Sequence, residues 1–240
     1  MKPVLGTEIS IGGRRWSQKL NEGIETERIV YTIAQRYDLP DVIARLLVSR
    51  HVSLEEVDGF LNPKLRDIMP DPSSLMDMDV AVDRLVKAIS GNELIGLFAD
   101  YDVDGATSSA LLKMYLDALN IRTELFIPDR IKDGYGPNKQ GLEYLKDKGA
   151  NLILTLDCGI LAFDVLEHFY VQGGEVIVVD HHMAEPKLPK AIAVVNPNRL
   201  DDLSDLGNLA AVGVVFLLLV ALTRKLRKVG WFSKKTEPNL

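Results

Sequence analysis

The chain has 240 residues, of which 47% are hydrophobic and 26% are charged, and its formal net charge at pH 7 is −6. This length and apolar content suffice for one large folded domain, with or without a small helical region before it, and exclude extensive disorder. Because the balance is acidic, a polyanion such as DNA would have to be held by a local basic patch or by metal ions. Composition therefore neither supports nor excludes nucleic acid.

Compartment and membrane contact are constrained by the apolar runs and by the cysteine content. The single cysteine, Cys158, excludes an internal disulfide and fits a reducing compartment, so we expect a cytoplasmic location. No signal peptide is visible at the N-terminus, and the longest apolar run, 209–222, is too short to span a bilayer. We expect no membrane contact and interpret this run as a buried helix.

The N-terminal part of the chain predicts a small helical region. Residues 1–24 show no sustained hydrophobic period, which indicates an extended arm. Apolar residues recur at three- and four-residue spacing over 25–37 and 40–49, which predicts two short helices, and Ser53-Leu-Glu-Glu56 is a capping box for a third. Prolines between 62 and 76 then mark a linker. We therefore assign 1–76 to an N-terminal arm and helical region.

The remainder, 77–240, predicts one α/β domain with a mostly parallel sheet and helices on both faces. An amphipathic helix over 77–90 is followed by apolar strands that alternate with helical segments. The expected strands are 94–99, 123–127, 152–156, 175–179 and 192–195. Their continuously apolar composition is typical of strands covered on both faces, and parallel sheets of this kind collect functional groups at the carboxyl ends of their strands.

Acidic residues follow directly on the first expected strand: Asp100, Asp102 and Asp104. Carboxylates at alternate positions repel one another, and hard divalent cations such as Mg²⁺ or Mn²⁺ would relieve that repulsion by taking oxygen ligands. We expect Gly105 to turn the chain into a helix whose N-terminal amides, with Thr107 and Ser108, could receive a phosphate oxygen. The alternative is that Thr107 and Ser108 only cap the helix.

Later strands also end in potential metal ligands. One ends in Leu156-Asp157-Cys158-Gly159 and another in Asp180-His181-His182, so both should converge on the same edge as the first acidic group. Imidazole with several carboxylates suits Mn²⁺ and tolerates Mg²⁺, whereas the lack of cysteine ligands argues against structural zinc. A bridging carboxylate would let a pair of cations activate water and clamp the oxygens of an in-line displacement at phosphorus. The sequence therefore predicts phosphoester hydrolysis.

These motifs resemble the successive motifs of the DHH phosphoesterase superfamily. The similar segments are Asp100–Ser108, Leu156–Gly159, Asp180–His182 and Val195–Arg199. Within the superfamily, Asp129–Gly136 and Leu209–Phe216 are similar to segments of the RecJ family, exonucleases that degrade single-stranded DNA from its 5′ end, and the resemblance extends to nearly the whole chain from about residue 14. It implies a metal-dependent 5′→3′ exonuclease of DNA repair and recombination, with single-stranded DNA as its partner.

The resemblance also implies a role for the metal-binding motifs. Asp102 and Asp104 would each hold a metal ion, and Asp157 would bridge the two ions. His181 would be a further ligand, and Asp100 would support these residues or bind through water. The implied cofactor is therefore a pair of Mn²⁺ or Mg²⁺ ions.

Further residues are implied to orient or bind the substrate. Asp180 would orient a histidine from behind, as carboxylates near metal sites commonly do, and His182 would face the scissile phosphate. Arg130 would bind a terminal phosphate of the DNA through its forked guanidinium, unless it is only a surface arginine. Asn196 and Arg199 would either contact substrate or belong to a turn that ends a strand.

The sequence ends at Leu240, before a further metal-binding aspartate and two more domains, DHHA1 and an oligonucleotide-binding fold, that the resemblance leads us to expect. We therefore expect an N-terminal portion with a weakened second metal site, and leave open whether it is active alone. One alternative is a non-catalytic remnant that binds metal or a protein partner. Another is a phosphodiesterase of the same superfamily that acts on oligonucleotides. Partners among other repair proteins stay unidentified.

Overall fold

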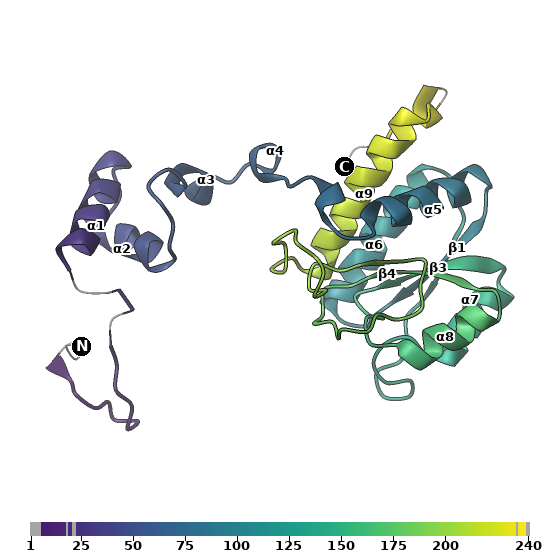
Figure 1. Ribbon diagram of the computed structural model, residues 1–240, viewed down its shortest axis with the longest axis horizontal. Coiled ribbons are helices and arrows are strands. Elements are labelled where there is room, and N and C mark those ends of the chain that lie inside the picture. Colours follow the sequence, from purple (N-terminus) through teal and green to yellow (C-terminus); the bar gives the residue numbers. More distant parts are fainter. Residues whose placement is uncertain (1–5, 18, 21–22, 234, 239–240) are drawn as a thin grey trace. The chain divides into compact units, whose positions relative to one another are not determined.

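The computed structural model describes residues 6–17, 19–20, 23–233 and 235–238. The chain divides into two compact units, Met1–Pro70 and Asp71–Leu240 (Figure 1). This division falls earlier than the boundary expected after residue 76. The reason is local, because the Asp71 carboxylate accepts a hydrogen bond from the Ser73 amide at the start of η2 (Pro72–Ser74) and pairs with Arg224 at 2.9 Å.

Within its described residues, the first unit contains four short α-helices: α1 (Ile24–Arg36), α2 (Asp41–Ser49), α3 (Val57–Leu61) and α4 (Leu65–Ile68). The helices expected over 25–37 and 40–49 are confirmed as α1 and α2, which bury a small apolar cluster around Ile33 and Leu47. Half of the expected capping box is present, since the Glu56 carboxylate accepts a hydrogen bond from the Ser53 amide at 2.9 Å. Within the expected linker, the chain makes the single turn α4.

The second unit is built on a five-stranded sheet with the order β2-β1-β3-β4-β5, in which every pairing is parallel. Its strands are β1 (Leu94–Ala99), β2 (Thr123–Phe126), β3 (Ala150–Leu156), β4 (Glu175–Val179) and β5 (Ala193–Val195). Each lies within three residues of an expected strand, which confirms the predicted parallel α/β fold.

Helices cover both faces of this sheet (Figure 1). One layer contains α5 (Met78–Ser90), α6 (Val103–Ala118) and α9 (Ala211–Lys228), and the other contains α7 (Lys139–Asp147) and α8 (Phe163–Val171). Successive strand residues point to opposite faces, so Phe98 and Ile153 pack toward α7 and α8 while their neighbours Leu97 and Leu154 are equally buried on the other side. This two-sided burial explains the continuously apolar strands.

The apolar run 209–222 forms most of α9, which is followed by η3 (Trp231–Ser233). Its Leu217, Leu218 and Leu222 side chains are buried against the second unit, as expected for a core helix. Among the described residues, no helix combines the length and apolar character needed to cross a membrane.

The chain reverses the direction in which it adds strands to the sheet at the pair β1 and β3. After β1 the chain crosses through α6 to β2 on one side, whereas β3 pairs with the opposite side of β1. In open parallel sheets the crevice beyond the carboxyl ends of such a strand pair is where ligands bind. Asp100 directly follows β1, and Asp157 directly follows β3.

The sequence predicts that Gly105 turns the chain into a helix, and this prediction is wrong. Helix α6 begins at Val103, so Gly105 lies in its first turn. A Cβ atom at Gly105 would lie 2.2 Å from the Asp100 carbonyl oxygen. Glycine is therefore required because the helix rests directly on the loop that carries the acidic residues.

A buried arginine with two partly exposed carboxylates fixes α5 to the opposite, amino-terminal edge of the sheet. Arg84 is 9% exposed, and its guanidinium donates to the Glu93 carboxylate at 2.7 Å and to the Glu175 carboxylate at 2.6 Å. Glu93 immediately precedes β1, and Glu175 begins β4. One arginine thus joins the helix to two strands.

Replacement of Arg84 by alanine should lower the free energy of unfolding by about 1–3 kcal/mol, because the hydrogen bonds to two carboxylates are lost where the guanidinium is desolvated. Chemical denaturation followed by circular dichroism measures this loss. The control is Arg122→Ala at an exposed arginine, which should change stability by less than about 0.5 kcal/mol. Equal stability of the two variants would contradict this assignment.

Candidate metal centre

The carboxylate of Asp157 occupies the centre of the crevice. Its backbone has a φ of 61°, in the left-handed region, while its amide donates to the Val179 carbonyl at 2.9 Å. The side chain is 1% exposed, and neither carboxylate oxygen has a hydrogen-bond donor among the described residues. A buried ionised carboxylate without a donor is unfavourable, so this site is built to place negative charge where something positive is required.

Electrostatics at Asp157 reflect this isolation. Burial raises the pKa of Asp157 to about 8, and a shared proton and charge repulsion with Asp102 add to the rise. Burial also raises the pKa of Asp100, whose Oδ1 atom is buried without a partner in the described part of the chain. Oxygen atoms of these three carboxylates lie within 4.8 Å of one another.

Asp102 caps the start of α6 and also contributes a carboxylate oxygen to the crevice. Its Oδ1 atom accepts hydrogen bonds from the amides of Asp104 at 2.9 Å and Gly105 at 3.1 Å, and these contacts hold the pKa of Asp102 below its ordinary value. Its backbone carbonyl accepts the Ala106 amide at 2.9 Å. Asp102 thus already accepts the amides that were expected to receive a phosphate oxygen, so that expectation stays a prediction.

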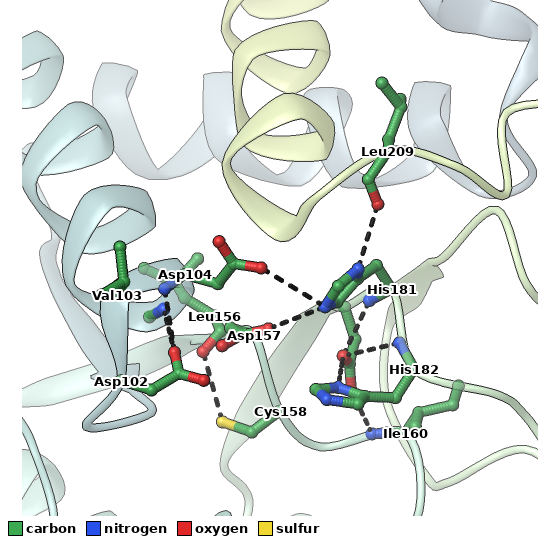
Figure 2. A network of polar contacts seen from close by, with 12 residues as sticks. Asp102, Val103, Asp104, Leu156, Asp157, Cys158, Ile160, His181, His182 and Leu209 are labelled. Atoms are coloured by element: carbon green, nitrogen blue, oxygen red, sulfur yellow. Dashed lines mark hydrogen bonds and ion pairs between the residues drawn. The ribbon is translucent and has the colours of Figure 1, made fainter. Parts of the chain in front are cut away.

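His181 faces the same crevice from the end of β4 (Figure 2). Its Nε2 atom lies 3.3 Å from Asp157 Oδ1 and 3.7 Å from Asp104 Oδ2. Its Nδ1 atom lies 3.0 Å from the Leu209 carbonyl oxygen, which can only accept a hydrogen bond. The neutral ring is therefore protonated at Nδ1, and the lone pair of Nε2 is directed toward the carboxylates, as a metal ligand requires.

His182 is held on the other side of Asp157 by Asp180. Asp180 is fully buried, and its Oδ1 atom lies 2.7 Å from His182 Nδ1. Although burial opposes ionisation of Asp180, hydrogen bonds from His182 and the Ile160 amide keep its pKa below the ordinary value. The same contact with Asp180 raises the pKa of His182. The pair therefore favours an imidazolium that can donate to an anionic substrate.

The crevice can accommodate two adjacent cations. Two groups of ligand atoms each lie within 4.8 Å, one formed by Asp157, His181 and His182 and the other by Asp100, Asp102 and Asp157. Asp157 belongs to both groups. Carboxylate oxygens with an imidazole nitrogen are a donor set that Mn²⁺ accepts and Mg²⁺ tolerates. A cation would also compensate the charge of the Asp157 carboxylate, whose oxygens have no hydrogen-bond partner among the described residues. The residues therefore fit such ions.

The expected substrate-binding residues lie in diverse surroundings. Arg130 is exposed, with its guanidinium 5.4 Å from the centre of the Tyr101 ring. Thr107 donates to the Val103 carbonyl at 2.7 Å within α6, and Ser108 is fully buried with no partner for its hydroxyl among the described residues.

Asn196 and Arg199 are engaged inside the protein. The Asn196 side chain is fully buried and donates to the His182 carbonyl at 2.9 Å. The Arg199 guanidinium is bonded to the carboxylates of Asp77 at 2.6 Å and Asp201 at 2.7 Å. These contacts favour the strand-ending turn over direct substrate contact, because the polar atoms that would bind DNA already have partners.

Some contributors to the site were not identified from the sequence. The Tyr135 hydroxyl lies 3.2 Å from His182 Nδ1 and donates to the Asp157 carbonyl at 3.3 Å, so the loop before α7 closes one side of the crevice. Tyr135 lies within the segment 129–136 that was noted for its resemblance. The Leu209 carbonyl is a backbone group and leaves no signal in the sequence.

Comparison with known families identifies a match over most of the second unit. Residues 94–237 match the DHH family, N-terminal domain. The single-stranded-DNA-specific exonuclease RecJ of Bacillus subtilis is 37% identical over 198 residues, which cover 82% of this chain and 25% of that protein. The protein of the same name from Escherichia coli is 36% identical over 207 residues, covering 85% of this chain and 35% of that protein.

Solved structures of similar proteins include metal complexes. RecJ from Thermus thermophilus in complex with Mn²⁺ has a TM-score of 0.66 and 27% identity, over 88% of this chain and 28% of that one. An exonuclease RecJ bound to manganese has a TM-score of 0.58 and 34% identity, over 68% of this chain and 40% of that one. The present chain thus spans between about a fifth and about a third of the length of the curated relatives that it matches.

Replacement of Asp157 by asparagine should stabilise the metal-free protein while removing its response to metal. The folded state binds the Asp157 proton with a pKa of about 8, far above the value of about 3.9 in an unfolded chain. Stability of the metal-free wild type should therefore fall as the pH rises from about 4 to about 8, and this component of the fall should be absent in Asp157→Asn.

Thermal unfolding at several pH values, with a chelator or with Mn²⁺, measures both effects. At pH 8 without metal, the asparagine variant should unfold at a higher temperature than the wild type. Addition of Mn²⁺ should raise the unfolding temperature of the wild type only. A variant that is less stable than the metal-free wild type at pH 8 would contradict the assignment.

Proposed function

The chain belongs to the DHH family, and we propose that it carries the metal-dependent centre of an exonuclease that hydrolyses single-stranded DNA from the 5′ end. The observation that carries this proposal is the convergence of Asp102, Asp157 and His181 at the β1/β3 switch, with the buried Asp157 carboxylate lacking any donor among the described residues. The choice of substrate follows the named relatives, which are single-stranded-DNA-specific exonucleases.

The proposed ligands follow the two groups that share Asp157. Asp157 belongs to both groups and would be shared by the two cations, with His181 Nε2 and the nearby Asp104 carboxylate holding one and Asp102 the other; His182, the remaining member of the first group, is assigned to the substrate instead. Asp100, which is buried and belongs to the same group as Asp102, would support this second side directly or through water. The second unit, Asp71–Leu240, would thus hold the catalytic centre.

Mn²⁺ or Mg²⁺ in this centre would supply an activated water and polarise the oxygens on phosphorus. The protein residues then provide orientation and proton transfer. His182, whose pKa is raised by the hydrogen bond to Asp180, would donate a hydrogen bond to the scissile phosphate and release a proton toward the leaving oxygen. Tyr135 limits rotation of the His182 ring through the contact between its hydroxyl and Nδ1.

The 5′-terminal phosphate is proposed to bind Arg130. This residue lies in the segment between β2 and α7, where the Asp129 carboxylate orders the chain by accepting the amides of Ile131 and Lys132. Arg130 is exposed, and the Tyr101 ring beneath it joins this segment to the acidic loop after β1. A guanidinium held in this way is suited to a terminal phosphate.

The same proposal extends to the partner and the cellular compartment. The partner is single-stranded DNA undergoing repair or recombination, in the cytoplasm, where the lone buried thiol of Cys158 would stay reduced. Asn196 and Arg199 are assigned to the turn that follows β5 and not to DNA binding, because their polar groups are engaged within the fold.

Asp102→Ala and His181→Ala should abolish metal-dependent nuclease activity with little loss of folding, because Asp102 is exposed and His181 is only partly buried, so neither side chain belongs to the core. Release of nucleotides from 3′-labelled single-stranded DNA in Mn²⁺ measures activity, and circular dichroism measures folding. Full activity in either variant would overturn the site assignment. Faster hydrolysis of dinucleotides than of long single strands would indicate an oligonucleotide phosphodiesterase instead.

Arg130→Ala should reduce the preference for 5′-phosphorylated over 5′-hydroxyl DNA by about ten- to hundredfold, because a charge-assisted bidentate contact is lost. Competition between the two substrates measures the ratio directly. Lys132→Ala provides a matched control, since it removes a neighbouring exposed charge from the same segment. An unchanged preference in Arg130→Ala, or an equal change in both variants, would exclude a specific phosphate contact.

A further inference from the structure

The segment Asn196-Pro197-Asn198 follows β5 and contacts the backbone of both adjacent histidines. The Asn196 Nδ2 atom donates to the His182 carbonyl at 2.9 Å, and the Asn198 Nδ2 atom donates to the His181 carbonyl at 2.5 Å. These contacts cross from the end of β5 to the end of β4. Two side-chain amides therefore hold the two histidines by their main chain.

Asn198 makes a second contact that reaches the segment before α9. Its Nδ2 atom also donates to the Gly207 carbonyl at 3.3 Å. Two residues later, the Leu209 carbonyl accepts the hydrogen bond from His181 Nδ1 at 3.0 Å (Figure 2). One amide group thus joins the backbone of His181 to the segment whose carbonyl holds the His181 ring.

The orientation of Asn198 is fixed from two directions. Its own amide donates to the Asn196 Oδ1 atom at 2.7 Å, and Asn196 is fully buried. On the other side, a Cβ atom at Gly207 would lie 2.7 Å from Asn198 Oδ1, so a larger residue would displace the bound amide. Gly207 thus leaves room for this side chain at its present position.

We propose that Asn198 is a positioning residue that prepares His181 for metal binding, by holding the His181 backbone and the Gly207–Leu209 segment at a fixed separation. The Leu209 carbonyl then keeps the proton on Nδ1 and leaves Nε2 free toward Asp157. This inference rests on the proposed function where it takes Nε2 as a metal ligand. Its effect on the His181 tautomer does not depend on that function.

Loss of the amide donors has a definite consequence. In Asn198→Asp a carboxylate of the same shape would face the carbonyl oxygens of His181 and Gly207, and repulsion would separate the two segments. The Leu209 carbonyl would then no longer select the Nδ1-protonated ring. Loss of such an outer contact to a metal-binding histidine typically weakens metal affinity by about ten- to hundredfold.

The test compares Asn198→Asp with Asn208→Asp. Asn208 is exposed in the same segment before α9 and has no side-chain hydrogen bond among the contacts described, so the control makes the same chemical change nearby. Calorimetric titration with Mn²⁺ gives the affinity. In the metal-free protein at alkaline pH, ¹⁵N chemical shifts of labelled histidine report which ring nitrogen of His181 carries the proton, with His181→Ala identifying its signals.

Wild type and Asn208→Asp should show the Nδ1-protonated tautomer, whereas Asn198→Asp should show a mixed tautomer and about ten- to hundredfold weaker Mn²⁺ binding. An unchanged tautomer with unchanged affinity in Asn198→Asp would overturn the proposal. If that variant does not fold, Gly207→Ala, which displaces the amide without removing it, must show the same two changes, and its failure to do so overturns the proposal equally.

The two measurements also separate this inference from the proposed function. A wild type that shows the Nδ1-protonated tautomer but binds no Mn²⁺ would contradict the metal centre, while the tautomer change in Asn198→Asp would still support the positioning role. A wild type that binds Mn²⁺ with the proton on Nε2 in the metal-free state would overturn the positioning role alone.

Discussion

The buried carboxylate of Asp157 is the constraint on which the rest of the site depends. Removal of an ionised carboxylate from water without hydrogen-bond donors costs on the order of several kcal/mol, and a protein relieves that cost by protonation or by a cation. Here the cost is high enough to raise the pKa of Asp157 to about 8. The surrounding polar groups at Asp102 and His181 approach as further ligands and not as donors, which is why the crevice is suited to metal.

The layer formed by α6 and α9 sets the distance between those ligands. Helix α6 begins at the Asp102 and Asp104 carboxylates, and the Leu209 carbonyl that holds His181 lies just before α9. The two helices pack together and share a buried hydrogen bond of 2.6 Å between the Tyr115 and Thr223 hydroxyls. Packing far from the crevice therefore fixes the separation of its two sides.

The sequence predicted the fold and the convergence of site residues because both follow from short-range patterns. Continuous apolar runs indicate the parallel strands, and the acidic and histidine residues that follow them must meet at one edge of the sheet. Interactions across long sequence separations were not predictable in this way. The sequence left Arg199 open between substrate contact and a turn, and only the fold reveals its pairing with Asp77, more than a hundred residues earlier in the chain. The His181 tautomer depends on a backbone carbonyl, which every residue possesses.

The central claim is that a cation replaces the proton on Asp157. It is tested most directly by calorimetric titration of the chain with Mn²⁺ at pH 7 in buffers of different ionisation enthalpy, which gives the number of protons released on binding. Because Asp157 is largely protonated at this pH in the metal-free protein, about one proton should be released as Mn²⁺ binds. Binding without proton release, or no binding, would contradict the account.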